Sequence, residues 1–218
     1  MPKHLSAYLR RHSLKWCRTS NMARLAFICL MIFQLLNMVG VLDFNPEYTW
    51  RGLFSTSFVI FIALEIVSYG YYARKKALLP GVLWALTFIS VALDFSADFF
   101  HLYGKFDWWD QMLHFVNSAN TCFIVFVIIS AYWIEGFTFS LVGAAGRLRL
   151  TLWLAAATTS ALGAIYEIEE YLEDLIYLTN RSGPGMDTSD DIFLNSLGIL
   201  VMTLVLYIIF RQRKKKLL

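Results

Sequence analysis

Six long apolar stretches constrain the fold of this chain more than any other feature of its sequence. Each has roughly the 20 residues that an α-helix needs to cross the hydrocarbon core of a bilayer. Backbone polar groups inside a bilayer must be satisfied within the protein, so the pattern predicts an all-α fold, a polytopic membrane helix bundle with six transmembrane helices. We place the spans at Leu25–Leu42, Leu53–Tyr72, Leu79–Phe100, Met112–Trp133, Leu150–Tyr171 and Ile192–Phe210.

Lysine and arginine residues fall mainly on one side of these stretches. That side holds the N-terminal arm, the loop 74–76, the loop with Arg147 and Arg149, and the C-terminal tail. The opposite side holds only three basic residues, Arg51, Lys105 and Arg181. Because basic loops mark the cytoplasmic face of a membrane protein, we expect a multi-pass protein with both termini cytoplasmic.

The same pattern predicts three segments. Residues 1–24 form a basic cytoplasmic arm, residues 25–210 form the six-helix transmembrane domain, and residues 211–218 form a basic cytoplasmic tail. The chain is 58% hydrophobic, which exceeds the share of roughly one half in soluble domains. The expected partner is the lipid bilayer. No sequence motif supports nucleic-acid binding, and the sequence does not define an oligomeric state.

Most acidic residues lie on the side opposite to the basic loops, and several fall inside apolar stretches. Ionisable groups at membrane depth are costly and usually face a protein interior or a wet cavity, which makes them candidates for function. Glu65 is an exception, because it lies in mid-span with no other ionisable residue at its level. We expect a neighbouring helix to satisfy it. The other acids form three elements at helical spacing, for which a solvated acidic surface is the alternative.

The first element opens the fourth stretch. Asp110 and His114 are four residues apart, which places both side chains on one helix face. Such a pair can bind a metal, or the acid can orient the imidazole. It can also be an ordinary polar contact at a helix start, where an aspartate suits the helix dipole. At the end of the preceding stretch, a further face is expected to hold Asp94, Asp98 and His101.

The second element lies at the end of the fifth stretch. Glu167 and Glu170 are three residues apart and share a face, whereas Glu169 and Glu173 lie on another face that we expect to be wet. Carboxylates on one face repel unless a cation or a proton lies between them, and carboxylates that project into a helix bundle can hold metals. The alternative is a solvated acidic turn just outside the membrane.

The third element runs from a loop into the sixth stretch. Asp187, Asp191 and Asn195 follow one another at intervals of four residues. Helix capping and dipole compensation can explain Asp187, but they fit Asp191 less well and Asn195 poorly. Gly198 follows, and a neighbouring backbone can approach closely there.

Together these elements are rich in oxygen ligands and contain one imidazole. Such a donor set suits a divalent metal, Zn, Mn or Mg. The six candidate ligands are Asp110, His114, Glu167, Glu170, Asp187 and Asp191, and the candidates for a supporting or alternative role are Asp94, Asp98, His101 and Asn195. Nucleophilic serine or cysteine catalysis has no support, because its sequence motifs are missing.

The three elements also carry a family resemblance. Asp-x-x-x-His-Phe stands at residues 110–115, Tyr-Glu-x-x-Glu at 166–170, and Asp-Thr-x-x-Asp at 187–191. In this order, over residues 50–210, they resemble the YjdF-like family of bacterial inner-membrane proteins and, more distantly, the VanZ-like membrane proteins. The chain departs from that pattern beside the first aspartate, where more variable or basic residues are expected: Trp109, Gln111 and Met112.

The resemblance implies a polytopic protein of the bacterial inner (cytoplasmic) membrane. VanZ-like proteins are associated with glycopeptide resistance, so the resemblance points to envelope chemistry without identifying a reaction. The departures beside the first aspartate leave the acid–histidine pair intact. The resemblance adds a lipid or envelope substrate to the expected partners.

Three functions remain open from the sequence. The first is a divalent-cation-binding protein that acts on a lipid or envelope substrate at the outer leaflet, where a cation would activate a water or polarise a phosphoryl oxygen. The second is a scaffold or sensor with a structural polar cluster. The third is a proton- or cation-coupled transporter, which is less favoured because no internal repeat or continuous polar path is visible. Our working hypothesis is a divalent-cation-binding membrane protein, and the sequence does not decide whether it is an enzyme.

Overall fold

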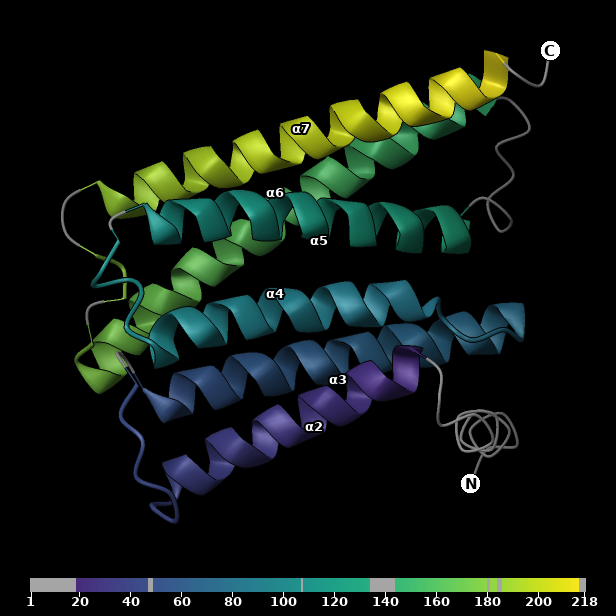
Figure 1. Ribbon diagram of the computed structural model, residues 1–218. Coiled ribbons are helices and arrows are strands. Elements are labelled where there is room, and N and C mark those ends of the chain that lie inside the picture. The colour runs from purple at the N-terminus through teal and green to yellow at the C-terminus, as the bar shows by residue number, and fades with distance from the viewer. Residues whose placement is uncertain are drawn as a thin grey trace. The chain divides into compact units, whose positions relative to one another are not determined.

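The computed structural model describes residues 19–46, 49–106, 108–133, 144–179, 181–183 and 186–215. Within these residues the chain forms six α-helices and no strand (Figure 1). All six are long and apolar enough to cross a membrane, so the predicted all-α fold with six membrane-spanning helices is confirmed. The helices are α2 (Thr19–Met38), α3 (Trp50–Lys75), α4 (Gly81–Phe99), α5 (Trp109–Trp133), α6 (Ala144–Tyr177) and α7 (Asp187–Lys215).

The first helix is displaced towards the N-terminus relative to the predicted span Leu25–Leu42. α2 already starts at Thr19 and ends at Met38. Gly40 then adopts a left-handed φ of +75°, and the N–H of Val41 donates to the carbonyl of Leu36 at 2.9 Å. This is a common way to close a helix with a glycine. Of the predicted arm 1–24, residues 1–18 lie outside the described residues.

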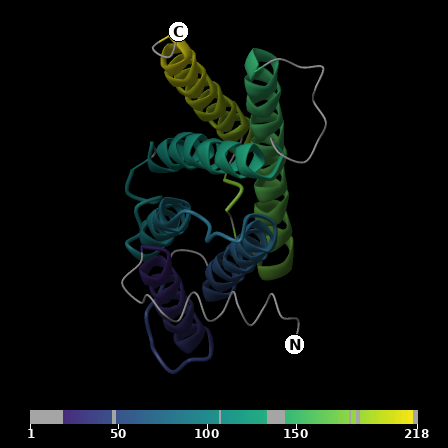
Figure 2. The same cartoon turned by 90° about the vertical axis from the view of Figure 1, so that its right-hand side faces the viewer.

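The chain divides into two compact units, and the first, Met1–Leu102, contains α2, α3 and α4. In Figure 2 these three helices are foreshortened, and α2 packs against both of the others. Phe27 of α2 is fully buried at their centre. Its ring centroid lies 5.7 Å from that of Phe61 on α3 and 5.3 Å from that of Phe88 on α4, within the usual range for aromatic pairs.

A partly buried ion pair joins the helices of the first unit. The guanidinium of Arg24 on α2 donates from Nε to Oε1 of Glu65 on α3 at 2.5 Å and from Nη2 to Oε2 at 3.1 Å. The same guanidinium lies 3.9 Å from the ring centroid of Trp84 on α4. Two parallel hydrogen bonds are the strongest form of a carboxylate–arginine contact. The expectation that a neighbouring helix satisfies Glu65 is therefore confirmed.

The second unit, Tyr103–Leu218, contains α5, α6 and α7. Contacts between α5 and α7 recur in order along both helices, from Ser118 with Asn195 to Phe126 with Phe210, so these helices run side by side in the same direction. A Cβ on Gly198 of α7 would lie 2.2 Å from the carbonyl oxygen of Phe115 on α5. The close backbone approach expected at Gly198 is thus confirmed.

The second unit has an apolar core around the middle of α5, α6 and α7. Its buried members come from all three helices: Cys122, Phe126, Leu152, Ala155, Ile199 and Leu206. Polar side chains gather towards one end of the unit, where α5 and α7 begin and α6 approaches its last turns. We call this the acidic end, defined by Asp110, Glu167, Glu170, Asp187 and Asp191.

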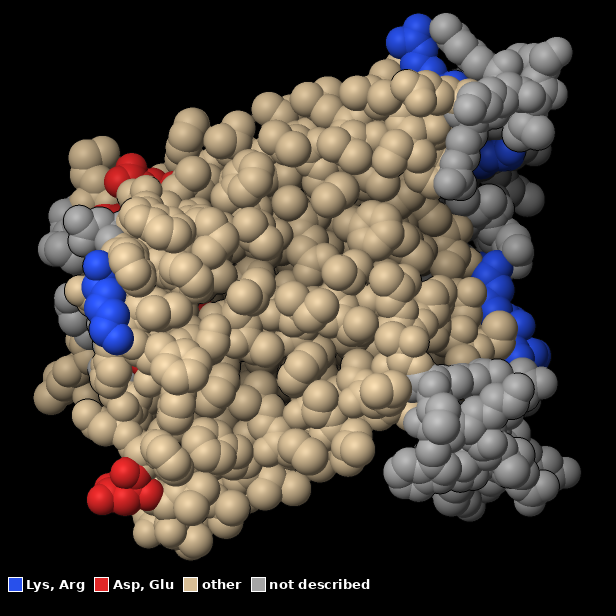
Figure 3. Space-filling model, viewed as in Figure 1, with Lys and Arg blue, Asp and Glu red and all other residues tan. Residues whose placement is uncertain are grey.

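Charged side chains lie mainly near helix ends. On the face drawn in Figure 3, the lengths between the helix ends are covered almost entirely by residues other than Lys, Arg, Asp and Glu. The exposed side chains of the described residues include large apolar ones, for example Val59 on α3 and Leu200 on α7. Lipid tails can solvate such surfaces and water cannot, so this pattern fits helices that span a bilayer.

Candidate metal centre

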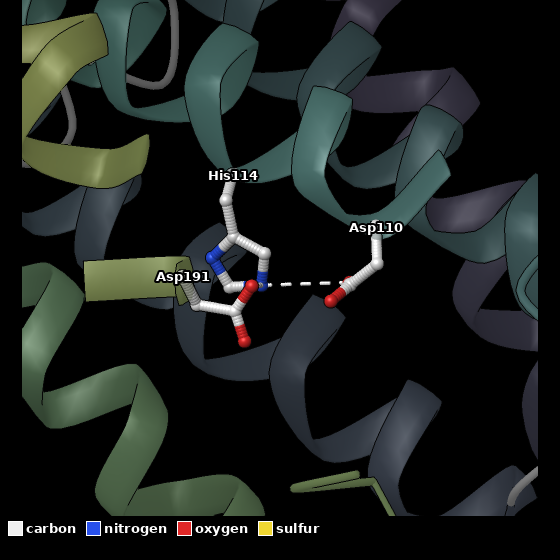
Figure 4. A group of neighbouring side chains, drawn as sticks. All are labelled: Asp110, His114 and Asp191. Carbon is white, nitrogen blue, oxygen red and sulfur yellow. Dashed lines mark ion pairs between the residues drawn. The ribbon is translucent and has the colours of Figure 1, made fainter. Parts of the chain in front are cut away.

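His114 lies among three carboxylates at the acidic end. Its Nε2 lies 3.5 Å from Oδ1 of Asp110 and 3.6 Å from Oδ1 of Asp191, and its Nδ1 lies 3.6 Å from Oε1 of Glu167. Figure 4 shows the ring of His114 with the carboxylates of Asp110 and Asp191 beside the same nitrogen. Three helices therefore contribute to one cluster, in which the structure brings these four residues together.

The distances in this cluster are long for hydrogen bonds and suitable for metal ligands. A nitrogen–oxygen hydrogen bond usually measures about 2.7–3.2 Å. Two ligand atoms that each lie about 2.1 Å from a tetrahedral metal are about 3.4 Å apart. One ligand atom each from Asp110, His114 and Asp191 can be chosen so that all three lie within 4.8 Å of one another. Small movements would bring these atoms around one cation.

Two carboxylate oxygens of the cluster lack a hydrogen-bond donor. Among the residues that the structure describes, neither Oε1 of Glu167 nor Oδ1 of Asp191 accepts a hydrogen bond, although both atoms are buried. Leaving a buried acceptor unsatisfied costs about 1–3 kcal/mol, and more for a charged group. The cluster thus has lone pairs on buried oxygens that a cation can bind.

The local sequence explains why these side chains meet. Asp110 occupies the first turn of α5, so His114 stands one turn further along the same face. Asn195, one turn beyond Asp191 on α7, accepts a 2.5 Å hydrogen bond from the Ser118 hydroxyl of α5. This buried contact fixes α7 against α5 directly below the cluster. Asn195 therefore joins α5 and α7 one turn from Asp191, and its supporting role at a metal site stays a prediction.

α6 approaches the same point because Gly163 carries no side chain. A Cβ at this position would lie 3.3 Å from Nδ2 of Asn195, which is tight packing. One turn further along α6, Glu167 reaches Nδ1 of His114. The ring of Tyr166 also meets that of His114 edge-on, with centroids 6.2 Å apart.

Glu170 has a different partner from the one predicted for a metal ligand. Its carboxylate lies 3.1 Å from Nη2 of Arg181, whose Nη1 lies 2.7 Å from Oε2 of Glu173. Arg181 Nη2 also donates to the Tyr166 hydroxyl at 2.8 Å. Glu173 was expected on a wet face, but it is buried because it pairs with this arginine, and that expectation is wrong.

Sequence reasoning missed Arg181 because it lies in a loop after α6. Asp174 holds that loop in place by accepting hydrogen bonds from the Thr179 hydroxyl and from the N–H groups of Arg181 and Ser182. The available signal was its position: Arg181 is one of three basic residues on the otherwise acidic side of the predicted spans.

Four further predicted site residues lie outside the group of Asp110, His114 and Asp191. They are Asp187, Asp94, Asp98 and His101. Asp187 starts α7, and its carboxylate lies against the loop, where a Cβ on Gly183 would stand. Asp94 and Asp98 lie on α4 in the first unit, and Asp98 is buried. His101 was expected to extend their face, which is wrong. α4 ends at Phe99, and His101 has a left-handed φ of +55° in the turn that follows.

The fold and this cluster define a class before any relative is considered: a multi-span helical membrane protein with a buried histidine–carboxylate cluster. The chain belongs to the family described as Predicted membrane protein (DUF2238), whose model matches residues 22–212. This is the YjdF family, so the YjdF-like resemblance is confirmed, whereas the VanZ-like resemblance receives no support. No curated protein and no solved structure matches the chain.

Proposed function

We propose that this protein binds a divalent metal ion through Asp110, His114 and Asp191, and that the bound ion acts on a lipid or envelope substrate. The observation that carries the proposal is the placement of three carboxylates around one imidazole at 3.5–3.6 Å. Two of these carboxylates have a buried oxygen that accepts no hydrogen bond from the described residues. Three carboxylates beside one another repel unless a cation or protons compensate them.

The donor set favours particular ions. Imidazole suits Zn, and carboxylate oxygens suit Mn and Mg; a site with one imidazole and two carboxylates fits Zn or Mn better than Mg. Three protein ligands leave at least one coordination position for water or substrate, which is the arrangement of catalytic rather than structural zinc sites. A cation held there would activate a bound water or polarise a phosphoryl or carbonyl oxygen.

The position of the cluster supports an amphiphilic substrate. His114 and Asp191 each stand one helical turn after the first residues of α5 and α7. At about 1.5 Å per residue, this puts the cluster less than about 10 Å below the helix starts, near the level of lipid headgroups. We place the acidic end at the outer face of the bacterial inner membrane and both termini in the cytoplasm, because of the basic residues at the opposite helix ends.

The interior of the second unit argues against a transport path through it. From Cys122 away from the acidic end, the three helices pack against one another through the apolar core. An ion that left the cluster in that direction would have to enter an apolar interior at a cost of many kcal/mol. A scaffold or sensor remains the second candidate, because the same residues join three helices.

Metal content is the decisive measurement. Protein purified in mild detergent and exposed in turn to Zn, Mn and Mg should retain one equivalent of metal after desalting, and His114→Ala should retain none. Asp110→Asn is a second variant that removes a ligand with little change in volume. Circular dichroism of both variants checks that the helices are intact. Absence of retained metal in the folded wild-type protein would overturn the proposal, and the cluster would then be structural.

A further inference from the structure

We infer that Glu167 is a positioning residue of the metal centre: its carboxylate lies beside Nδ1 of His114, where it would accept the Nδ1–H once Nε2 holds the metal. The inference rests on the proposed function, because it assigns a role within the same site. It also changes the role expected from the sequence, in which Glu167 was a metal ligand.

The two ring nitrogens of His114 face different partners. Nε2 has two carboxylates beside it, from Asp110 at 3.5 Å and Asp191 at 3.6 Å. Nδ1, on the other side of the ring, has the carboxylate of Glu167 at 3.6 Å. An imidazole binds a metal through one nitrogen only, and a hydrogen bond at the other nitrogen decides which one that is. Two carboxylates can complete a metal site at Nε2, whereas Nδ1 has a single acceptor.

The surroundings of Glu167 suit an acceptor. Its side chain is only 6% exposed, and within the described part of the chain its Oε1 receives no hydrogen bond. The neighbouring carboxylate of the same helix, Glu170, is paired with Arg181 at 3.1 Å. Glu167 is therefore the carboxylate of α6 that faces the imidazole.

The chemical consequence is a fixed tautomer and a stronger ligand. A carboxylate that accepts from the far nitrogen of a metal-bound histidine holds the ring orientation and raises the basicity of the ligating nitrogen. Loss of such a partner typically lowers metal affinity about 10–100-fold. Loss of a ligand also changes the coordination of the metal itself. The two roles are thus distinguishable.

The test is a Co²⁺ titration of the full-length protein in detergent, read from the visible absorption of the bound ion. Glu167→Leu should weaken binding about 10–100-fold and leave the band positions of the wild-type spectrum unchanged at saturation. Glu167→Gln keeps an acceptor oxygen and should recover most of the affinity. Glu170→Gln, one turn away on the same helix, is the matched control and should bind Co²⁺ like the wild type.

Nitrogen-15 NMR of histidine-labelled protein provides a second readout. With Zn²⁺ bound, the wild-type His114 signal, assigned with His114→Ala, should show a protonated Nδ1 and a metal-bound Nε2. A shifted Co²⁺ spectrum in Glu167→Gln, wild-type affinity in Glu167→Leu, or metal on Nδ1 would each overturn the positioning role while leaving the metal site in place. Failure of the wild-type protein to bind either ion would instead overturn the proposed function.

Discussion

The two units of this protein bury acidic side chains in contrasting ways. In the first unit, Glu65 receives two hydrogen bonds from the Arg24 guanidinium at 2.5 and 3.1 Å, so the charge is matched within the protein. In the second unit, three carboxylates surround His114 at 3.5–3.6 Å without a hydrogen-bonding match for all their oxygens. The Arg24–Glu65 pair is closed, whereas the cluster leaves two buried carboxylate oxygens without a hydrogen bond among the described residues, which is the basis of our proposal that it binds a cation.

The second unit contains its own internal control for this contrast. Arg181 compensates Glu170 and Glu173 at 3.1 and 2.7 Å, only one or two turns of α6 beyond Glu167. Within the part of the chain that the structure describes, an arginine thus pairs with Glu170 and Glu173, whereas the carboxylates around His114 have no arginine partner. Acidity alone therefore does not distinguish the candidate site. The distances do: the nitrogen–oxygen distances are 2.7–3.1 Å around Arg181 and 3.5–3.6 Å around His114.

The largest effect is expected from Asp191→Asn. The amide keeps the shape of the side chain and removes a charged ligand, so metal affinity should fall by more than the roughly 100-fold limit for residues that only support a ligand. Equilibrium dialysis against Zn²⁺ measures the change. Retention of wild-type affinity would remove the contrast between the two units, because the cluster would then be as self-sufficient as the Arg24–Glu65 pair.

Arg24→Met should be the most destabilising change in the first unit. It leaves Glu65 without the arginine, and removing one partner of a fully buried ion pair costs about 3–5 kcal/mol. Because this pair is only partly buried, with side-chain exposures of 12% and 28%, we expect a loss near the lower end of that range. The double variant Arg24→Met/Glu65→Leu should recover most of that loss, because it removes the unpaired charge. Denaturation in mixed micelles gives the free energy of unfolding. Zn²⁺ binding should be unchanged in both variants when they are folded.

Metal removal should destabilise the wild-type protein by a comparable but smaller amount. A ligand present at 100 times its Kd stabilises the folded state by about 2.7 kcal/mol, so a chelator should lower the Tm. The same chelator should leave the Tm of Asp191→Asn unchanged. An equal drop in both proteins would mean that the chelator acts elsewhere.

The smallest effect concerns the glycines at which helices approach. A Cβ on Gly198 would clash with the Phe115 carbonyl oxygen, and one on Gly81 would lie 2.9 Å from the backbone nitrogen of Ser20. Alanine at either position should cost about 1–3 kcal/mol by overpacking. Only Gly198→Ala should also weaken Zn²⁺ binding, because it displaces α5 from α7 beneath the cluster. Equal affinities in the two folded variants would contradict this link.

Periodicity and apolar length suffice to predict the helices and the pairing of Asp110 with His114, since an interval of four residues fixes a shared face. The position of Asp191 beside them was accessible only as a hypothesis, because it depends on two helices packing in parallel. Arg24 could not be placed from the sequence. A basic residue before an apolar stretch is expected in the cytoplasmic arm, whereas Arg24 lies inside α2 and pairs with Glu65.

Glu170 and Glu173 could not be assigned from helical spacing. Spacing states which side chains share a face, but it does not state what comes to meet that face. The route of the loop after α6 decides the matter, and hydrogen bonds to Asp174 determine that route. The prediction for His101 is wrong for a similar reason. α4 ends at Phe99, and His101 has a left-handed backbone conformation in the turn that follows, so the predicted face does not reach it.

The length of α6 has a consequence for how a metal would reach the cluster. Its 34 residues extend about 51 Å at 1.5 Å per residue. The hydrocarbon core measures about 30 Å, and membrane helices rarely tilt beyond about 40°. Even at that tilt, about 12 Å of the helix length must lie outside the hydrocarbon core. If the acidic end is the part that emerges, ions could enter from the adjoining aqueous phase, and occupancy would report the metal supply of that compartment rather than of the opposite one.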